Sequence, residues 1–172
     1  KAAAIDLAKE GVNLAICSRD QEKIDKAKEE ILQKTDHNIK VIALKADLDS
    51  LEDIQIFLQE VEHSLGVVDI LVNNTQGPNP GKALEKKIND YQTAFDLLFK
   101  CAVHTTSLAI PHMKSQRWGR VINVSSITVK EPLNNLVLSN SLRAALVTWA
   151  KSLSIDMAEF NITINNVLTG FF

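Results

Sequence analysis

Short apolar runs alternate with longer amphipathic stretches along the 172 residues of the chain. Each run has the length and composition expected for a strand that is buried on both faces of a sheet. The longer stretches carry apolar residues three and four positions apart, which is typical of helices that pack on a sheet. The predicted strands cover residues 12–17, 40–46, 67–73, 120–124 and 162–168, and the predicted helices cover residues 1–10, 21–33, 50–65, 88–116 and 140–160.

Residues beside the helices support these boundaries. Gly11 follows the first helix, where a residue in the left-handed conformation commonly ends a helix. Ser18 precedes the second helix, and its hydroxyl is suited to cap the first turn. A loop rich in Gly and Pro at residues 76–82 separates the third strand from the long helix that follows. These signals favour the same division into elements as the hydrophobic pattern does.

Strands and helices alternate through the whole chain, without an internal repeat or an interdomain linker. This order is typical of right-handed βαβ units and a parallel sheet. We therefore predict one doubly wound α/β (Rossmann) domain over residues 1–172. In such a fold ligands bind beyond the carboxyl ends of the strands, so the residues that follow each strand are the candidates for a site.

Composition narrows the class of partner. Apolar residues make up 45% of the chain, charged residues 23%, and the net charge is −2, which indicates a globular protein with no nucleic-acid or membrane partner. Without a run of about 18 apolar residues or a signal peptide, we expect a cytoplasmic location. Cys17 and Cys101 lack the close Cys or His neighbours of a zinc site or a redox pair, which predicts free thiols and no metal site.

Both ends of the chain fall inside predicted structure. Residues 1–10 form a helix with no strand before it, and residues 161–172 form a strand that stops directly after Thr169-Gly170. We therefore expect the sequence to be truncated at both ends relative to a complete domain of this kind.

Five short motifs lie at or near the predicted strands, in this order: Asp47-Leu48, Asp69–Asn74, Pro111–Met113, Gly119–Ser126 and Ile162–Val167. Their order and spacing resemble the short-chain dehydrogenase/reductase family over essentially all 172 residues. The resemblance implies a Rossmann fold that binds NAD(P) and transfers a hydride to or from a carbonyl or alcohol carbon. The family's glycine-rich phosphate loop belongs just before residue 1 and is not part of this sequence.

Ser18-Arg19 ends the strand at which this family distinguishes NADP from NAD. An acidic residue there suits the ribose hydroxyls of NAD, whereas a guanidinium offers planar donors to a 2′-phosphate. Arg19 therefore favours NADP over NAD, although the carboxylate of Asp20 is an alternative ligand for the ribose.

Three further motifs of the resemblance imply cofactor contacts. Asp47-Leu48 matches the position that contacts the adenine ring, and Asn73-Asn74 matches an element that lines the adenosine ribose and stabilises the central strands. Thr169-Gly170 occupies the Pro-Gly position near the nicotinamide, with the proline lost. Gln76 stands where the family has a glycine, so the turn after Asn74 is expected to differ.

The family's catalytic serine is kept at Ser126, but three other catalytic positions differ. In the matching register, its Tyr-x-x-x-Lys motif falls on Ser139 and Arg143, and its helix asparagine falls on Leu98. Serine is a weaker acid than a phenol, and arginine stays protonated where a lysine can relay a proton. If the chain is active, Ser126 and Ser139 are expected to position the substrate oxygen and Arg143 to stabilise negative charge.

Other titratable residues are poor substitutes for the lost tyrosine. Tyr91, the single tyrosine of the chain, lies on a different segment. His104 lies off the helical face that Leu98 shares with Cys101, Ala102 and Thr105. The remaining histidines, His37, His63 and His112, fall at predicted helix or loop positions and are poor candidates for catalysis.

Two functions remain open. The first is an oxidoreductase that acts on a small carbonyl or alcohol substrate with NADP, or with NAD, and the combination of residues 131–140 with Asn74-Thr75 resembles a branch described as 3-oxoacyl-carrier-protein reductase-like. The second is a catalytically impaired nucleotide-binding or scaffold protein of the same fold. A weaker variant of the first is an enzyme whose acid comes from outside this sequence. The apolar faces of helices 88–116 and 140–160 predict a homodimer or homotetramer.

Overall fold

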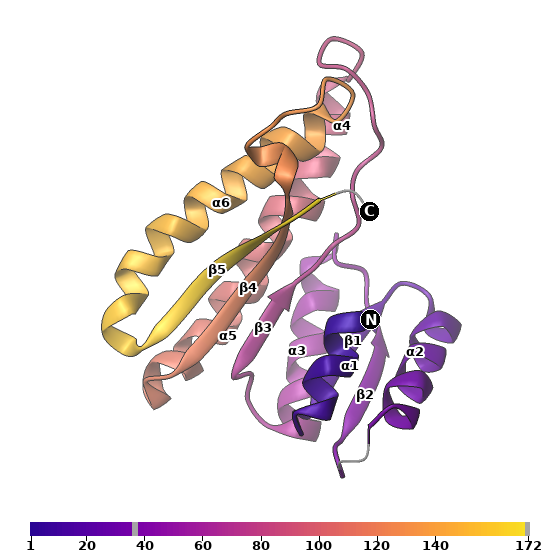
Figure 1. The fold of residues 1–172 in the computed structure, drawn as a ribbon, viewed down its shortest axis with the longest axis vertical. Coiled ribbons are helices and arrows are strands. Elements are labelled where there is room, and N and C mark those ends of the chain that lie inside the picture. Colours follow the sequence, from indigo (N-terminus) through magenta and orange to yellow (C-terminus); the bar gives the residue numbers. More distant parts are fainter. Residues whose placement is uncertain (36–37, 171–172) are drawn as a thin grey trace. The chain divides into compact units, whose positions relative to one another are not determined.

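The protein consists of two compact α/β units, Lys1–Val67 and Val68–Phe172, which we call the N-terminal unit and the C-terminal unit. The structure is a computed structural model, and it describes residues 1–35 and 38–170. Figure 1 shows the helices and strands of both units along the chain.

The N-terminal unit has two parallel strands and three helices. Strand β1 (Leu14–Ser18) pairs with β2 (Val41–Lys45), in a register that places Leu14 beside Val41 and Ser18 beside Lys45. Gly11 has φ of 81°, so the predicted left-handed residue after the first helix is confirmed. The helices are α1 (Ala2–Lys9), α2 (Gln21–Gln33) and α3 (Leu51–Leu65).

The core of the N-terminal unit forms between α1, α2 and the strand pair. Ile5 and Ala8 of α1 and Ile31 of α2 pack with Leu14 and Val41 of the two strands, and all five side chains are buried. Ile5 and Ala8 lie three residues apart on α1, so their burial follows the helical period.

The C-terminal unit is a three-stranded parallel sheet with helices along its length. The strand order is β3-β4-β5, with β3 at Ile70–Asn73, β4 at Gly119–Ser126 and β5 at Ile162–Thr169. Helices α4 (Ile88–Phe95) and α5 (Cys101–Gln116) are joined by a π-helical turn at Asp96–Lys100. Helix α6 (Val137–Met157) connects β4 to β5, and short 3₁₀ turns flank it at Ile127–Val129 and Ala158–Phe160.

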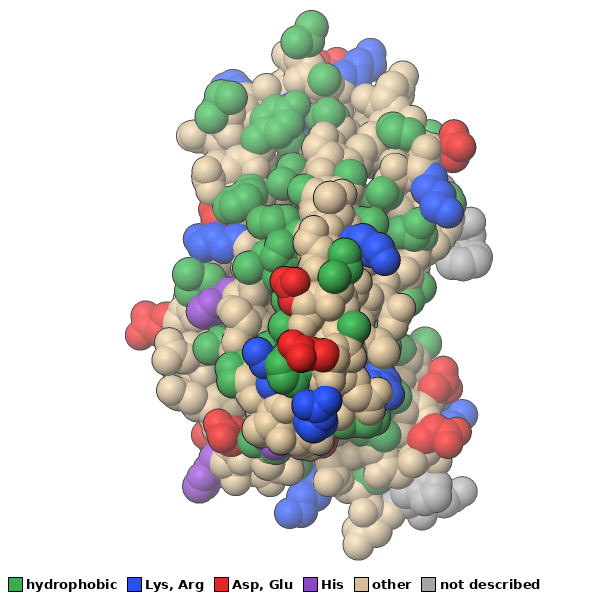
Figure 2. All heavy atoms as spheres, turned by 90° about the vertical axis from the view of Figure 1, so that its left-hand side faces the viewer, with side chains coloured by type: hydrophobic (Ala, Val, Ile, Leu, Met, Phe, Trp, Pro, Cys, Tyr) green, Lys and Arg blue, Asp and Glu red, His purple; other side chains and the backbone are tan. Residues whose placement is uncertain are grey.

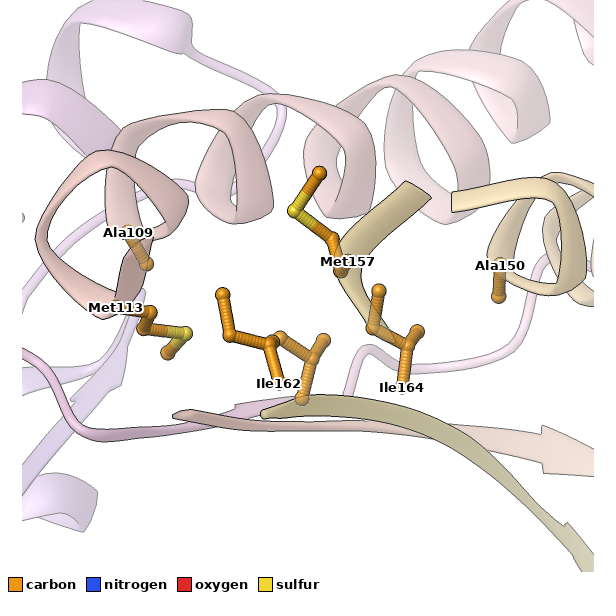
Figure 3. Close-up of a cluster of buried hydrophobic side chains, with 7 residues drawn as sticks. Ala109, Met113, Ala150, Met157, Ile162 and Ile164 are labelled. Carbon is orange, nitrogen blue, oxygen red and sulfur yellow. The ribbon is translucent and has the colours of Figure 1, made fainter. Parts of the chain in front are cut away.

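The core of the C-terminal unit lies between α5, α6 and one face of the sheet. Figure 3 shows Ile162 and Ile164 of β5 pointing toward Met113 of α5 and Met157 of α6. Gly119 permits the close approach of α5 to β4, because a Cβ at this position would meet the Met113 side chain at 2.5 Å. This packing holds α5 and α6 against the amino-terminal halves of β4 and β5.

Two loops of the C-terminal unit are joined by backbone hydrogen bonds. Gly81, in the segment between β3 and α4, forms an isolated parallel bridge with Leu136, just before α6. The Gly81 amide donates to the Asn135 carbonyl at 2.6 Å, and the Val137 amide donates to the Gly81 carbonyl at 3.4 Å. The bridge therefore ties the segment after β3 to the start of α6.

The α/β class and the parallel strands predicted from the sequence are confirmed. Three details were wrong. Ser18 does not cap α2, because the cap is Asp20, whose carboxylate accepts a hydrogen bond from the Lys23 amide. Strand β3 begins at Ile70 rather than at residue 67, and α6 begins three residues before the predicted start, which places Ser139 inside the helix.

Two other expectations concern membrane-spanning helices and the cysteines. Within the described parts of the chain, no helix is long and apolar enough to cross a membrane. Cys17 is a free cysteine, as predicted. Burial raises the pKa of the Cys17 thiol to about 11, so this cysteine is protonated and unreactive near neutral pH.

Candidate functional site

At the end of β1, Arg19 is the side chain that remains available to a ligand. The Asp20 carboxylate accepts from the Lys23 amide at 3.1 Å and lies 2.9 Å from Lys23 Nζ. Hydrogen bonding to the Lys23 side chain, with a smaller contribution from its amide, lowers the pKa of Asp20. Ser18 Oγ accepts from the Asp20 amide at 3.3 Å. Arg19 is exposed and has no hydrogen bond or ion pair with any residue that the structure describes.

Asp47 and Leu48 follow β2, next to the end of β1. The Ala46 amide donates to the Ser18 carbonyl at 3.0 Å, so the two predicted strand-end positions of this unit are neighbours. Asp47 Oδ1 accepts from the Asp49 amide at 3.1 Å, which shapes the turn into α3. Asp47 and Leu48 are both half-buried, and their contact with an adenine ring stays a prediction.

Asn73 begins a ladder of amide side chains across the C-terminal sheet. Asn73 Nδ2 donates to Asn123 Oδ1 at 2.9 Å, and Asn123 Nδ2 donates to Asn166 Oδ1 at 3.1 Å. The register places these three residues side by side on β3, β4 and β5. Thr105 and Thr106 of α5 complete the network, at 2.7 Å and 3.1 Å from the Asn73 amide. The predicted stabilising role of Asn73 in the central strands therefore has a structural basis, whereas Asn74 is exposed and takes no part in this network among the described residues.

Ser126 ends β4 and is half-buried, with its hydroxyl oxygen held by Thr128. The Thr128 amide and hydroxyl donate to Ser126 Oγ at 3.2 and 3.0 Å. Since the oxygen accepts in both bonds, the Ser126 proton is left to donate to a ligand. Thr169 lies beside Ser126 in the sheet register, and its hydroxyl donates to the Ser125 carbonyl at 2.9 Å. Gly170 follows directly and is exposed.

Ser139 and Arg143 form a pair one turn apart on α6. Arg143 Nε donates to Ser139 Oγ at 3.2 Å, and Nη1 donates to the Val124 carbonyl at 2.7 Å. Only 8% of Arg143 is exposed, and desolvation by burial lowers the pKa of its guanidinium. The bond to the Val124 carbonyl places this pair beside the last residues of β4, which ends at Ser126, and the catalytic roles of the three residues stay a prediction.

The alternative acids are not placed to replace the lost tyrosine. The Tyr91 hydroxyl donates to the Ala83 carbonyl at 3.3 Å, and Leu98 is buried within the π-helical turn. His112 Nε2 lies 3.9 Å from Asp69 Oδ1, next to the opposite end of the sheet. His104 Nε2 is buried without a hydrogen bond to any described residue. His63 lies on α3, and His37 lies outside the described residues.

Sequence reasoning missed the contribution of Asn123, Asn166 and the Val124 carbonyl. Asn73 is the last residue of β3, and Asn123 and Asn166 each stand three residues before the end of their strands. An asparagine near the end of all three strands is the signal that could have revealed the ladder. No sequence pattern marks a backbone carbonyl that will accept from a buried guanidinium. In residues 1–35 and 38–170, no group of three His, Cys, Asp or Glu side chains could hold a metal ion.

Parallel strands with connecting helices and polar residues at the strand ends define a dinucleotide-binding α/β protein. The sequence profile described as short chain dehydrogenase matches residues 1–172. The chain belongs to the short-chain dehydrogenase/reductase family.

Individual relatives agree with this assignment. The chain is 32% identical over 171 residues to the NADPH-dependent reductase BacG of Bacillus subtilis (strain 168), covering 99% of this chain and 66% of that protein. It is 28% identical over 171 residues to the 3-oxoacyl-[acyl-carrier-protein] reductase FabG of Staphylococcus aureus (strain Mu50), and the match covers 98% of this chain and 68% of that protein. The structure also resembles the crystal structure of YwfH, an NADPH dependent reductase involved in bacilysin biosynthesis. The TM-score is 0.93 at 32% sequence identity, and the match covers 99% of this chain and 66% of YwfH. The chain therefore spans about two thirds of the length of these relatives.

Proposed function

We propose that this chain is part of an oxidoreductase that transfers a hydride between a nicotinamide cofactor and a small carbonyl or alcohol substrate. The observation that carries the proposal is the group of Ser126, Ser139 and Arg143 near the carboxyl end of β4. Both serine oxygens accept hydrogen bonds within the protein, so both hydroxyl protons are available to a substrate oxygen. Arg143 adds a fixed positive charge beside Ser139.

The proposed cofactor is NADP, with NAD as the second choice. Asp20 is engaged as the cap of α2 and in an ion pair with Lys23, which argues against its use as a ribose ligand. Arg19 stands free at the strand end and suits a 2′-phosphate. Family membership supports Asp47, Leu48, Asn74, Thr169 and Gly170 as further contacts. When bound, the nicotinamide supplies or accepts the hydride.

The residues of this chain act on the substrate oxygen. In the reductive direction, the hydride adds to the carbonyl carbon and the oxygen gains negative charge. Ser126 and Ser139 donate hydrogen bonds to that oxygen, and Arg143 stabilises its charge through Ser139 and through the local field. The final proton comes from solvent or from a hydroxyl, because no phenol or lysine occupies the family's positions.

A substrate of the 3-oxoacyl type is the specific version of this proposal, supported by the similarity to FabG. The second candidate function is a nucleotide-binding or scaffold protein with impaired catalysis. This second function is favoured because Leu98, Ser139 and Arg143 replace three catalytic side chains of the family. Tyr91 does not replace the lost tyrosine, since its hydroxyl donates to the Ala83 carbonyl.

The test is a full-length protein assayed for NADPH binding by nucleotide fluorescence and for NADPH oxidation with a panel of ketones and 3-oxoacyl thioesters. Loss of one oxyanion donor typically costs about 10²–10³-fold in turnover, so Ser126→Ala is expected to reduce NADPH oxidation by that factor. Ser141→Ala, an exposed serine on α6, is the matched control. Turnover that survives Ser126→Ala would overturn the role given to Ser126, and NADPH binding without turnover would select the scaffold function.

We also propose that the protein is a homodimer or homotetramer that uses α5 and α6. An open groove of about 680 Å³ runs along these helices, lined by Ile110, Pro111, Trp149 and Leu153 among others. Figure 2 shows hydrophobic side chains between charged ones on the side of the C-terminal unit where α6 lies. A second copy would cover this surface. Light scattering that gives a monomer at micromolar concentration would overturn the proposal. We further propose a cytoplasmic location, supported by the free thiol of Cys17.

A further inference from the structure

Arg143 is a buried cation without a carboxylate partner. Among the residues that the structure describes, no Asp or Glu forms an ion pair with it, and its two hydrogen-bond acceptors, Ser139 Oγ and the Val124 carbonyl, are both neutral. With 8% of the residue exposed, solvent provides little compensation. Buried charges in proteins are normally paired, because desolvating an isolated ion is costly.

The described strand ends beside Arg143 provide no negative charge either. The ends of β3, β4 and β5 include residues 73–80, 123–129 and 166–170, and none of these stretches contains an Asp or Glu. The desolvation that lowers the pKa of Arg143 is therefore not offset by an acidic neighbour at the strand ends. An anion bound at the guanidinium would supply that compensation.

The guanidinium has donors to spare. Nε and one N–H of Nη1 are engaged, and Nη2 makes no hydrogen bond with the described residues. The unused donors of Nη1 and Nη2 lie in one plane, in the fork geometry that binds a carboxylate through two parallel hydrogen bonds. A lysine at this position would offer one point charge without that geometry.

We propose that Arg143 binds a carboxylate of the substrate, so that the substrates of this protein are oxo acids or the corresponding hydroxy acids. The inference rests on the proposed function. Ser126 and Ser139 hold the reacting oxygen, and Arg143 holds the carboxylate through Nη1 and Nη2, which limits the carboxylate to a position close to the reacting carbon. Neutral ketones and esters lack the group that would compensate the buried charge.

The experiment compares carboxylates with their methyl esters as ligands of the full-length protein–NADPH complex. Pyruvate, acetoacetate and levulinate are titrated beside the three methyl esters, with cofactor fluorescence and calorimetry as readouts. Since a bidentate, charge-assisted contact is lost in the ester, at least one acid is expected to bind at least about tenfold more tightly than its ester. Arg143→Gln is expected to reduce this ratio to about one, and Arg143→Lys to leave an intermediate ratio.

Lys151→Gln, which removes an exposed cation from the same helix, is the charge-matched control and is expected to leave the ratio unchanged. Equal binding of acids and esters, an acid preference that survives Arg143→Gln, or no saturable binding of any acid to a complex that holds NADPH would each overturn the inference. If Arg143→Gln fails to fold, the ratio of acid to ester affinity in the wild type and in Arg143→Lys still tests whether Arg143 binds the carboxylate. Failure to bind NADPH would instead overturn the proposed function.

Discussion

The amide ladder and the Arg143 pair lie in the same unit and are both polar, but they differ in how completely they are satisfied. Asn123 is fully buried, and each end of its amide has a partner on a neighbouring strand. Arg143 is nearly as buried, yet it carries a charge with no counter-ion among the described side chains. A closed network of neutral groups stabilises a fold, whereas an uncompensated charge is a group prepared for a ligand.

The largest expected effect is on turnover. The double variant Ser139→Tyr/Arg143→Lys restores the family's acid and its partner, which replaces the uncompensated charge by a proton-transfer pair. Because general acid catalysis typically contributes about 10²–10⁴-fold, NADPH oxidation with ketones is expected to rise by up to that factor from a very slow wild-type rate. Fast wild-type turnover that is lost in Arg143→Ala would show that the present residues form a different active site.

Breaking the ladder is expected to cause the largest loss of stability. Asn123→Ala removes two hydrogen bonds. Asn166 Oδ1 loses the donor on β4, whereas Asn73 keeps its bonds with Thr105 and Thr106, and the expected cost is about 2–4 kcal/mol. Urea unfolding of the full-length protein measures the change. Asn165→Ala is the control, because Asn165 is exposed and its amide bonds only Thr163 Oγ1. Equal losses in the two variants would contradict the structural role given to the ladder.

Arg19 extends the comparison to an exposed cation without a partner. Arg19→Ala is expected to weaken NADPH binding by about 1–3 kcal/mol through loss of charge-assisted contacts to the 2′-phosphate, and to leave NADH binding nearly unchanged. Fluorescence titrations with the two cofactors measure the difference. Equal affinities in the wild type, or no effect of the substitution, would remove Arg19 from the cofactor site.

Arg143→Met sharpens the contrast with Asn123. Removing an uncompensated buried charge relieves its desolvation, which offsets the loss of two hydrogen bonds, so stability is expected to change by less than about 1 kcal/mol. The comparison is made by urea unfolding without a ligand. A loss as large as that in Asn123→Ala would mean that Arg143 serves the fold in the same way as the ladder.

The smallest expected effect is on the pH dependence of stability and concerns Cys17, whose burial favours the neutral thiol. Its pKa is raised from 9.0 to about 11 by burial, so the folded state keeps the thiol proton that the unfolded state loses. The resulting stability is present below pH 9 and is lost as pH rises through 11. Cys17→Ala is expected to flatten this part of the stability profile relative to the wild type. Parallel profiles for the two proteins would contradict the shift.

The sequence predicted the elements and the class of fold because each element buries one face with its own period. Helix α2 was predicted at its observed bounds, and the buried face shared by Leu98, Cys101, Ala102 and Thr105 was also predicted correctly. Ser139 and Arg143 were singled out by their register with the family's Tyr-x-x-x-Lys motif, but their hydrogen bond on one helix was not predicted, because the predicted helix began after Ser139. The ladder and the Val124 contact could not be derived in this way, because they depend on strand register and on backbone carbonyls that tertiary packing brings together. The cap of α2 was missed because Ser18 and Asp20 are both good capping residues, and only the geometry at the end of β1 distinguishes them.

The bridge between Gly81 and Leu136 has a thermodynamic consequence for ligand binding. It joins the segment that follows β3 to the residues just before Ser139, so part of the conformational entropy of that segment is already lost when the protein folds. A ligand that contacts these residues meets a preorganised backbone, and less of its binding free energy is consumed in ordering the loop.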